Sequence, residues 1–356
     1  MNNRQLARTC TIEKVASWEN LFAAAAKARR GKSRRPDVED WWMRRESELS
    51  AIRSELLSGR YEPGGYRFFE IREPKRRMIA AAPFRDRVLH HALCNILGPV
   101  LERQFIARSF SCQVGKGTTA ARECCRQLVN HHRYVLKCDI RKFFPSIDHQ
   151  ILLAMLDRKV ACRATRELIR RIVGSFQTGR ELPAIPFDGE DRVVAEARPR
   201  GLPIGNLTSQ LWGNFYLDRL DHCLTEGWRH GAMLRYTDDF LIFDDDASTL
   251  QTVKHAVAAK LGQLRLQLAE TKSRVLAVRE GVPFCGFQFF PGLRPRVLGA
   301  TKRRFEERRE RLVKRRAFRL VSETVFAWYQ FSREGNTTGL RQAYMRQPWR
   351  RKTSCP

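Results

Sequence analysis

Two adjacent aspartates, Asp238 and Asp239, lie in the middle of the apolar segment Leu234–Phe243, which reads LRYTDDFLIF. The aromatic and β-branched residues around them favour extended structure, so the segment predicts a β-hairpin with both acids at its turn. Neighbouring carboxylates repel each other, and a divalent cation between them would relieve that repulsion. The pair therefore predicts a metal site, although an Asp-Asp turn in an ordinary surface hairpin would have the same local sequence.

A third acid supports the metal site. The apolar run Val135–Ile140 predicts a strand that ends at Asp139. Oxygen ligands suit Mg²⁺, and three carboxylates can hold two such ions about 4 Å apart, one to activate an attacking hydroxyl and one to stabilise a leaving pyrophosphate. Without metal, their mutual repulsion should raise the carboxylate pKa values. We therefore expect Asp139, Asp238 and Asp239 to be catalytic, with Ile140 at the same site and two Mg²⁺ ions, or alternatively Mn²⁺, as cofactor.

The composition indicates a polyanionic partner. The chain has 356 residues, with 66 Lys and Arg against 38 Asp and Glu and a formal net charge of +28. This excess favours nucleic acid over a membrane surface, because no apolar run approaches the roughly 20 residues that span a bilayer. The first ten residues, MNNRQLARTC, hold no apolar signal core, and the ten cysteines form no C-x-x-C pair. We therefore expect a cytosolic protein with reduced cysteines.

Hydrophobic periodicity alternates between helical and extended along the chain, which predicts both helices and strands. Residues 1–59 read as helical, and the segment from Arg294 reads as a helical tail with 18 Lys and Arg against 5 Asp and Glu. A polar loop or hairpin is expected at Thr178–Arg200. The other expected helices are Arg85–Phe105, one that follows the loop Ser111–Thr119, Gly205–Leu224 and Thr252–Leu266. The expected strands are Tyr66–Ile71, Met78–Ala82, Tyr134–Ile140 and the pair Arg274–Val278 and Pro283–Phe290.

The order of Asp139, Gly205 and Tyr236–Asp239 resembles the palm of a reverse transcriptase, and the likeness extends from Tyr66 to Phe290. The matching segments are Glu73–Ile79 in the fingers, Ser111–Thr118 near template and nucleotide, Cys138–His149 in the palm and Val282–Phe289 as the hairpin that grips the primer end. The resemblance implies an α+β fold, that of a right-hand polymerase with fingers, a palm built on an antiparallel sheet and a helical thumb. The implied domains are a helical N-terminal extension at 1–60, fingers at 61–135, a palm at 136–290 with a fingers insertion around 150–200, and a basic helical thumb at 291–356.

The same resemblance assigns residues to a nucleotide site. Lys75 and Arg77 would hold the incoming triphosphate, and Lys272 would protonate the leaving pyrophosphate. Phe144 lies five residues after Asp139, where this fold places an aromatic ring that excludes a ribose 2′-hydroxyl. Phe143 is the alternative if the register differs by one residue, and a plain core phenylalanine is the simpler interpretation.

The second palm motif points to a subgroup. Leu202–Gln210 reads LPIGNLTSQ, with Ile204 where related polymerases carry glutamine and Gln210 where they carry proline. This form, with Gly205 between them, resembles the reverse transcriptases of diversity-generating retroelements, which implies error-prone cDNA synthesis biased to template adenines. An isoleucine offers the nucleotide pocket a surface without directional hydrogen bonds, so discrimination between base pairs should weaken. A neutral packing substitution is the alternative.

The resemblance also implies partners. These are dNTPs, a template-repeat RNA, the cDNA primer or product and an oligomer of a small accessory variability protein, with no membrane involved. The implied location is the cytoplasm of a prokaryotic or phage-infected cell. The rival hypotheses are a group II intron or other bacterial reverse transcriptase, and a non-catalytic RNA-binding module of polymerase ancestry.

Basic residues in a loop and in the tail are expected to contact nucleic acid. Contacts of this kind go to the phosphate backbone and depend on salt. The tail cations suit a thumb on an RNA–DNA duplex, but they can equally bind the accessory protein or a structured RNA. The residues are Lys116, Arg303, Arg304, Arg308, Arg309, Arg311, Lys314, Arg315 and Arg316.

Overall fold

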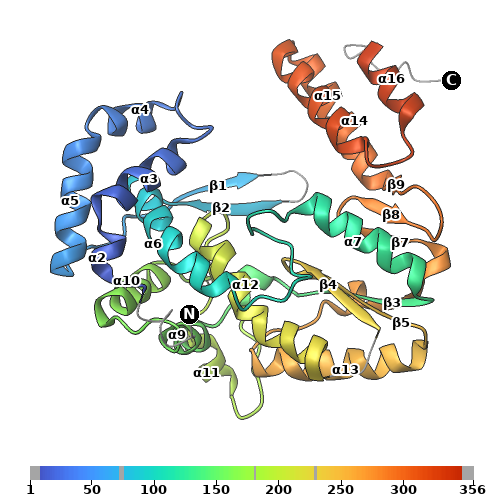
Figure 1. Cartoon of the computed structure of the whole chain (residues 1–356), viewed down its shortest axis with the longest axis horizontal. Helices are drawn as coiled ribbons and strands as arrows, with labels where there is room; N and C mark the ends of the chain where they lie inside the picture. The colour runs from blue at the N-terminus through green and yellow to red at the C-terminus, as the bar shows by residue number, and fades with distance from the viewer. Residues whose placement is uncertain (1–8, 72–75, 180–181, 228–230, 347–356) are drawn as a thin grey trace.

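The computed structural model describes residues 9–71, 76–179, 182–227 and 231–346 and combines helices with antiparallel sheets (Figure 1). The chain begins with helices α2 (Ile12–Val15), α3 (Trp18–Arg29), α4 (Pro36–Met43) and α5 (Arg45–Ser58). Ser17 caps α3 by accepting a hydrogen bond from the Asn20 N–H, and Gly59 ends α5 with a left-handed φ of 68°. The helical interpretation is confirmed for most of the described part of residues 1–59, apart from the break at 30–35.

A hairpin and two long helices follow. Strands β1 (Arg67–Ile71) and β2 (Arg77–Ala81) pair antiparallel, as predicted. Helix α6 (Phe84–Glu102) packs against α3. Helix α7 (Thr118–His131) begins directly after the loop at 111–117, called the glycine-rich loop below because it holds Gly115 and Gly117. In Figure 1 the hairpin lies between the N-terminal helices and α7. Lys75 falls between the two strands, outside the described residues.

The central sheet has four antiparallel strands in the order β4-β5-β3-β6. Its strands are β3 (Tyr134–Asp139), β4 (Ala232–Tyr236), β5 (Asp239–Asp244) and β6 (Arg274–Ala277). Leu136 and Cys138 of β3 belong to the core formed with α12 (Leu207–His222) and α13 (Ala247–Gln263), whereas Val135 belongs to the core formed with α7. Because successive strand residues point to opposite faces, Lys137 and Asp139 face the α7 side.

Between β3 and α12 the chain forms four shorter helices, α8 (Phe143–Ser146), α9 (His149–Asp157), α10 (Arg163–Gly174) and α11 (Arg192–Ala197). The expectation of a loop or hairpin at Thr178–Arg200 is therefore wrong at its end, where α11 forms. Asp191 caps this helix by accepting a hydrogen bond from the Val194 N–H at 2.7 Å. Arg198, the first residue after the helix, is buried and forms an ion pair with Asp148. The tertiary ion pair stabilises a helix too short to persist alone.

The expected pairing of Arg274–Val278 with Pro283–Phe290 is also wrong. Strand β6 joins the central sheet beside β3, and the second segment folds back on itself as β7 (Val282–Phe284) and β8 (Phe287–Phe289). The turn between them has left-handed φ values of 43° at Cys285 and 88° at Gly286. Strand β9 (Arg296–Val297) completes this small sheet.

The basic tail folds into helices α14 (Gly299–Lys314), α15 (Phe318–Ser332) and α16 (Thr338–Arg346), which project from the sheet at one end of the molecule (Figure 1). These helices have their own small core, in which Phe305 stacks on Trp328 with ring centroids 4.3 Å apart. Arg122 of α7 joins the tail to the body through hydrogen bonds of 2.7 and 2.6 Å to Glu334. Within the described residues, no helix combines the length and apolarity that a membrane crossing requires.

Candidate active site

The three aspartates meet at one end of the central sheet. Strands β3 and β5 pair so that Asp139 lies directly opposite Asp239. Strands β4 and β5 form a hairpin in which Tyr236 pairs with Asp239, so Thr237 and Asp238 make a two-residue turn. The hairpin is therefore confirmed, with Asp238 in the turn and Asp239 as the first residue of the following strand.

Two lysines already accompany these acids. Lys137, two residues before Asp139 on the same face of β3, lies 3.0 Å from a carboxylate oxygen of Asp239 and donates to the carbonyl of Pro283 at 2.8 Å. Lys272 forms an ion pair with Asp139. Each lysine places a positive charge where the crowded carboxylates would otherwise repel each other.

Burial acts on the remaining negative charge. Burial, with a smaller contribution from the charges of Asp139 and Asp238, raises the pKa of Asp239 to about 6 although Lys137 lowers it. Burial also raises the pKa of Asp238, and Asp139 adds to that rise, while Arg77 and Lys272 oppose it. The positive charge of Arg77, at the start of β2, thus acts on the acidic turn from another element of the fold.

Within the described ranges, no three His, Cys, Asp or Glu side chains are gathered into a preformed metal cluster, so the two-ion centre stays a prediction. The donor chemistry nevertheless fits Mg²⁺, because Asp139, Asp238 and Asp239 offer hard oxygen atoms whose ionised forms a cation would stabilise. Ile140 has a buried apolar side chain, so it can contribute only its backbone carbonyl.

The raised pKa of Asp239 predicts how stability depends on pH without metal. An acid with a higher pKa in the folded than in the unfolded protein stabilises the fold below its ordinary pKa, and this stabilisation is lost as pH rises through about 6. Since 31% of the side chain is exposed, solvent weakens the effect. We expect thermal melts in EDTA to show this loss in the native protein and not in Asp239→Asn. Parallel curves for the two proteins from pH 4 to pH 7 would contradict the assignment.

The residues predicted to line the nucleotide pocket come from three elements. Phe144 is half-buried whereas Phe143 is buried, which favours Phe144 as the exposed ring. Gly213 of α12 allows this arrangement, because a Cβ atom there would lie 3.1 Å from the Phe144 ring. Gly205 has a left-handed φ of 117°, and a Cβ atom there would lie 3.3 Å from Ile79 of β2. Gly205 of the second palm motif therefore packs closely against the hairpin, and α12, which follows this motif, packs closely against Phe144 of the first palm motif.

The two unusual residues of that motif are accessible. Ile204 is half-buried and Gln210 is exposed at the first turn of α12. The Gln210 side-chain oxygen accepts a hydrogen bond from the Cys112 thiol at 3.2 Å. This contact ties Gln210 to the glycine-rich loop.

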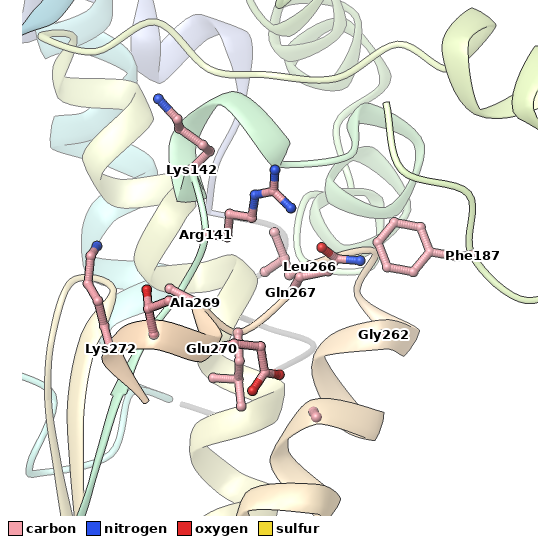
Figure 2. A pocket seen from close by; sticks show the side chains of 12 residues that line it. Arg141, Lys142, Phe187, Gly262, Leu266, Gln267, Ala269, Glu270 and Lys272 are labelled. Carbon is pink, nitrogen blue, oxygen red and sulfur yellow. The ribbon is translucent and has the colours of Figure 1, made fainter. Parts of the chain in front are cut away.

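A cavity of about 750 Å³ is lined by α13 and by Lys272, the ion-pair partner of Asp139 (Figure 2). Figure 2 shows Lys142 and Lys272 at one end of it and Phe187 at the other, with Arg141 between them. Arg141, Lys142 and Lys272 outnumber the acid Glu270 among the residues that line the cavity, which favours an anionic ligand such as a phosphate chain.

Comparison with known proteins decides the family. The family described as "Reverse transcriptase (RNA-dependent DNA polymerase)" matches residues 71–289, which is more than half of the chain. The chain belongs to the reverse transcriptase family. The α+β fold with its antiparallel sheet is that of a right-hand polymerase, and the predicted enzyme family is confirmed.

Individual relatives are distant. Protein YkfC of Escherichia coli (strain K12) is 24% identical over 281 residues, which cover 67% of this chain and 70% of that protein. Two solved chains, from a "Partial Cas6-RT-Cas1--Cas2 complex" and a "Cas6-RT-Cas1--Cas2 complex", are each 21% identical over 71% of this chain with a TM-score of 0.40. This chain spans 41% and 26% of their respective lengths.

In this member of the reverse transcriptase family, two residues predicted to contact nucleic acid bind other parts of the protein. The Lys116 ammonium donates hydrogen bonds to the carbonyls of Ser109 and Ala107 at 2.8 and 3.0 Å, so it stabilises its own loop. Arg309 is buried inside the tail, over the Tyr344 ring at 5.2 Å. Helical periodicity places Arg309 on the inner side of α14, next to Phe305. Exposed positions among the predicted tail contacts are Arg303, Arg308, Arg311, Lys314, Arg315 and Arg316, and Arg304 is half-buried.

Two site residues were missed. Strand alternation identifies Lys137, because it lies on the same face as Asp139 two residues earlier. Arg235, immediately before the turn segment, is buried in the same region of the sheet, and its position in an apolar strand was the available signal.

Proposed function

We propose that the chain is an RNA-directed DNA polymerase that uses Asp139, Asp238 and Asp239 as its catalytic acids. The observation that carries the proposal is the cross-strand pairing of Asp139 with Asp239 next to the Asp238 turn, in a chain of the reverse transcriptase family. When bound by these acids, Mg²⁺ would supply the charge that activates a primer hydroxyl and stabilises pyrophosphate.

Side chains around the acids suit a nucleotide substrate. Arg77 acts on the acidic turn from the hairpin and Lys272 pairs with Asp139, so cations from two elements would hold phosphates near the acids. Phe144 presents the ring that would exclude a 2′-hydroxyl and select deoxynucleotides.

The fold supports a division of the chain into the subdomains of a right-hand polymerase. We assign residues 61–135 to fingers, 136–290 to the palm with an insertion around 150–200, and 291–356 to a thumb, after an N-terminal extension at 1–60. The β7–β8 hairpin would grip the primer end, because the carbonyl of Pro283 and the Asp239 carboxylate share Lys137.

Primer extension by the purified chain tests this activity. We expect a DNA primer on a defined RNA template to be extended with dNTPs and Mg²⁺, to stall in EDTA and to resume when metal is restored. Ribonucleotides should be poor substrates. Bound RNA that is not copied under any metal condition would instead favour the non-catalytic RNA-binding module.

We further propose that the enzyme is the mutagenic polymerase of a diversity-generating retroelement, acting in the cytoplasm on a template-repeat RNA with an accessory variability protein. Ile204 and Gln210 support this subtype, because both differ from the usual motif and both remain accessible beside the glycine-rich loop. A group II intron or other bacterial reverse transcriptase is the alternative.

Replacing Ile204 with glutamine is expected to lower misincorporation opposite template adenine several-fold, because a directional hydrogen-bonding group restores discrimination in the pocket. Deep sequencing of cDNA from one defined RNA, made with and without the accessory protein, measures this directly. Ile204→Val is the matched control, since it keeps an apolar surface and should keep the error spectrum. If Ile204→Gln leaves the spectrum unchanged, the general bacterial reverse transcriptase becomes the better proposal.

A further inference from the structure

A buried arginine lies beneath the acidic turn. Arg235 of β4 is 1% exposed and precedes Asp238 by three residues. Its guanidinium donates to both carboxylate oxygens of Asp221 on α12, through Nε at 2.7 Å and Nη2 at 2.6 Å. Asp221 is fully buried, so this bidentate pair is held in a region shielded from water.

The rest of the guanidinium reaches the turn itself. Nη1 donates to the backbone carbonyl of Thr237 at 2.9 Å and to the side-chain oxygen of Asn214 at 3.1 Å. Nη2 also donates to the Ser109 hydroxyl at 3.1 Å. Arg235 therefore joins α12, the segment before the glycine-rich loop and the catalytic hairpin in one hydrogen-bonded group.

The glycine-rich loop holds the same turn from a second side. The Thr237 hydroxyl donates to the Ser111 hydroxyl at 2.8 Å, and the Asn214 amide donates to the Ser111 carbonyl at 2.7 Å. The backbone of Arg235 is bound as well, since its N–H donates to Arg108 and its carbonyl accepts from Phe110.

The turn needs this support because its backbone is strained. Thr237 has a φ of 58°, a left-handed conformation that β-branched residues rarely adopt and that costs about 1–3 kcal/mol. Such a conformation persists only where surrounding contacts over-determine it. A buried ion pair is seldom needed for stability alone, because apolar residues of similar size often stabilise as well or better.

We propose that Arg235 is a positioning residue that, with Asp221, fixes the Thr237 carbonyl and thereby aims the Asp238 carboxylate at the metal site. This inference rests on the proposed function, because it concerns the geometry of the catalytic turn. Arg235 touches no substrate in this role and acts through Thr237 and Asp238.

The test uses variants that separate an effect on the position of the Asp238 carboxylate from an effect on folding. In Arg235→Met with Asp221→Leu, apolar side chains replace both charges, so the fold should survive without the bond to Thr237. Arg235→Lys keeps the charge beside Asp221 but lacks the fork that also reaches Thr237. Arg198→Met is the matched control, because Arg198 is buried against Asp148 in another part of the chain.

Three quantities are measured on each folded protein, namely Mn²⁺ affinity by calorimetry without substrates, kcat with KM for dNTP, and RNA affinity. We expect the Mn²⁺ affinity and the kcat of both Arg235 variants to fall about 10–100-fold. Their KM for dNTP and their RNA affinity should change little. The control should lose thermal stability only.

The outcomes are distinguishable. A folded Arg235 variant with native kcat and native Mn²⁺ affinity would overturn the positioning role. A native chain that binds Mn²⁺ but never copies RNA would refute the proposed function, while the Mn²⁺ affinities of the variants would still decide the role of Arg235. A native chain that binds no Mn²⁺ would refute both.

Discussion

Replacing Asp238 with asparagine is expected to reduce metal-dependent nucleotide addition by about 1,000-fold or more. The Asp238 carboxylate is the metal ligand that the turn would contribute, next to the Asp139–Asp239 pair. Its loss removes several kcal/mol of metal-borne transition-state stabilisation, where each 1.4 kcal/mol corresponds to tenfold in rate. Primer extension on RNA under single-turnover conditions measures the effect. Asp139→Asn should behave in the same way.

These variants should remain folded and bind RNA. Burial and the neighbouring acid already disfavour the charged form of Asp238, so removing its charge relieves repulsion and leaves the fold intact. Asp40→Asn, the same chemical change at an exposed position on α4, is the control and should retain full activity. Undiminished extension by Asp238→Asn would refute the metal-site assignment.

Charge reversal on the outer side of α14 should have the second large effect. Arg303, Arg308 and Lys314 are exposed, and changing all three to glutamate should weaken binding to an RNA–DNA duplex strongly. If each contacts a phosphate, the slope of log affinity against log salt should become shallower by about three, because fewer counterions are released. Fluorescence anisotropy over a series of salt concentrations gives both the affinity and the slope.

A matched triple variant separates a specific surface from net charge. Arg158, Arg163 and Arg192 are equally exposed but lie in the region between β3 and α12, away from the tail. Their reversal changes the total charge by the same amount and should leave most of the affinity and the slope. A native slope in the α14 variant would indicate that Arg303, Arg308 and Lys314 bind the accessory protein instead.

Much of the local structure follows from short-range sequence alone. The apolar alternation on both sides of Asp238 and Asp239 predicts the hairpin, and the run that ends at Asp139 predicts its neighbouring strand, because strand propensity and side-chain alternation act over a few residues. The order of these motifs was sufficient for the polymerase family, which the family comparison confirms. The retroelement subtype, read from Ile204 and Gln210, remains a proposal.

The tertiary structure decided which residues interact with residues far away in the sequence. Lys116 looked like a phosphate contact, yet it binds carbonyls of its own loop, and Arg309 looked like one of many tail cations, yet it is buried. Neither outcome is encoded locally, because burial and ion pairing depend on which segments pack together. The same holds at the site, where Asp139, Asp238 and Asp239 were evident from the sequence. Alternation places Lys137 on the face of Asp139, but its ion pair with Asp239 and the buried pair of Arg235 with Asp221 formed only when the strands and α12 packed together. Sequence thus determined which groups can do the chemistry, and packing determined which charges hold them in place.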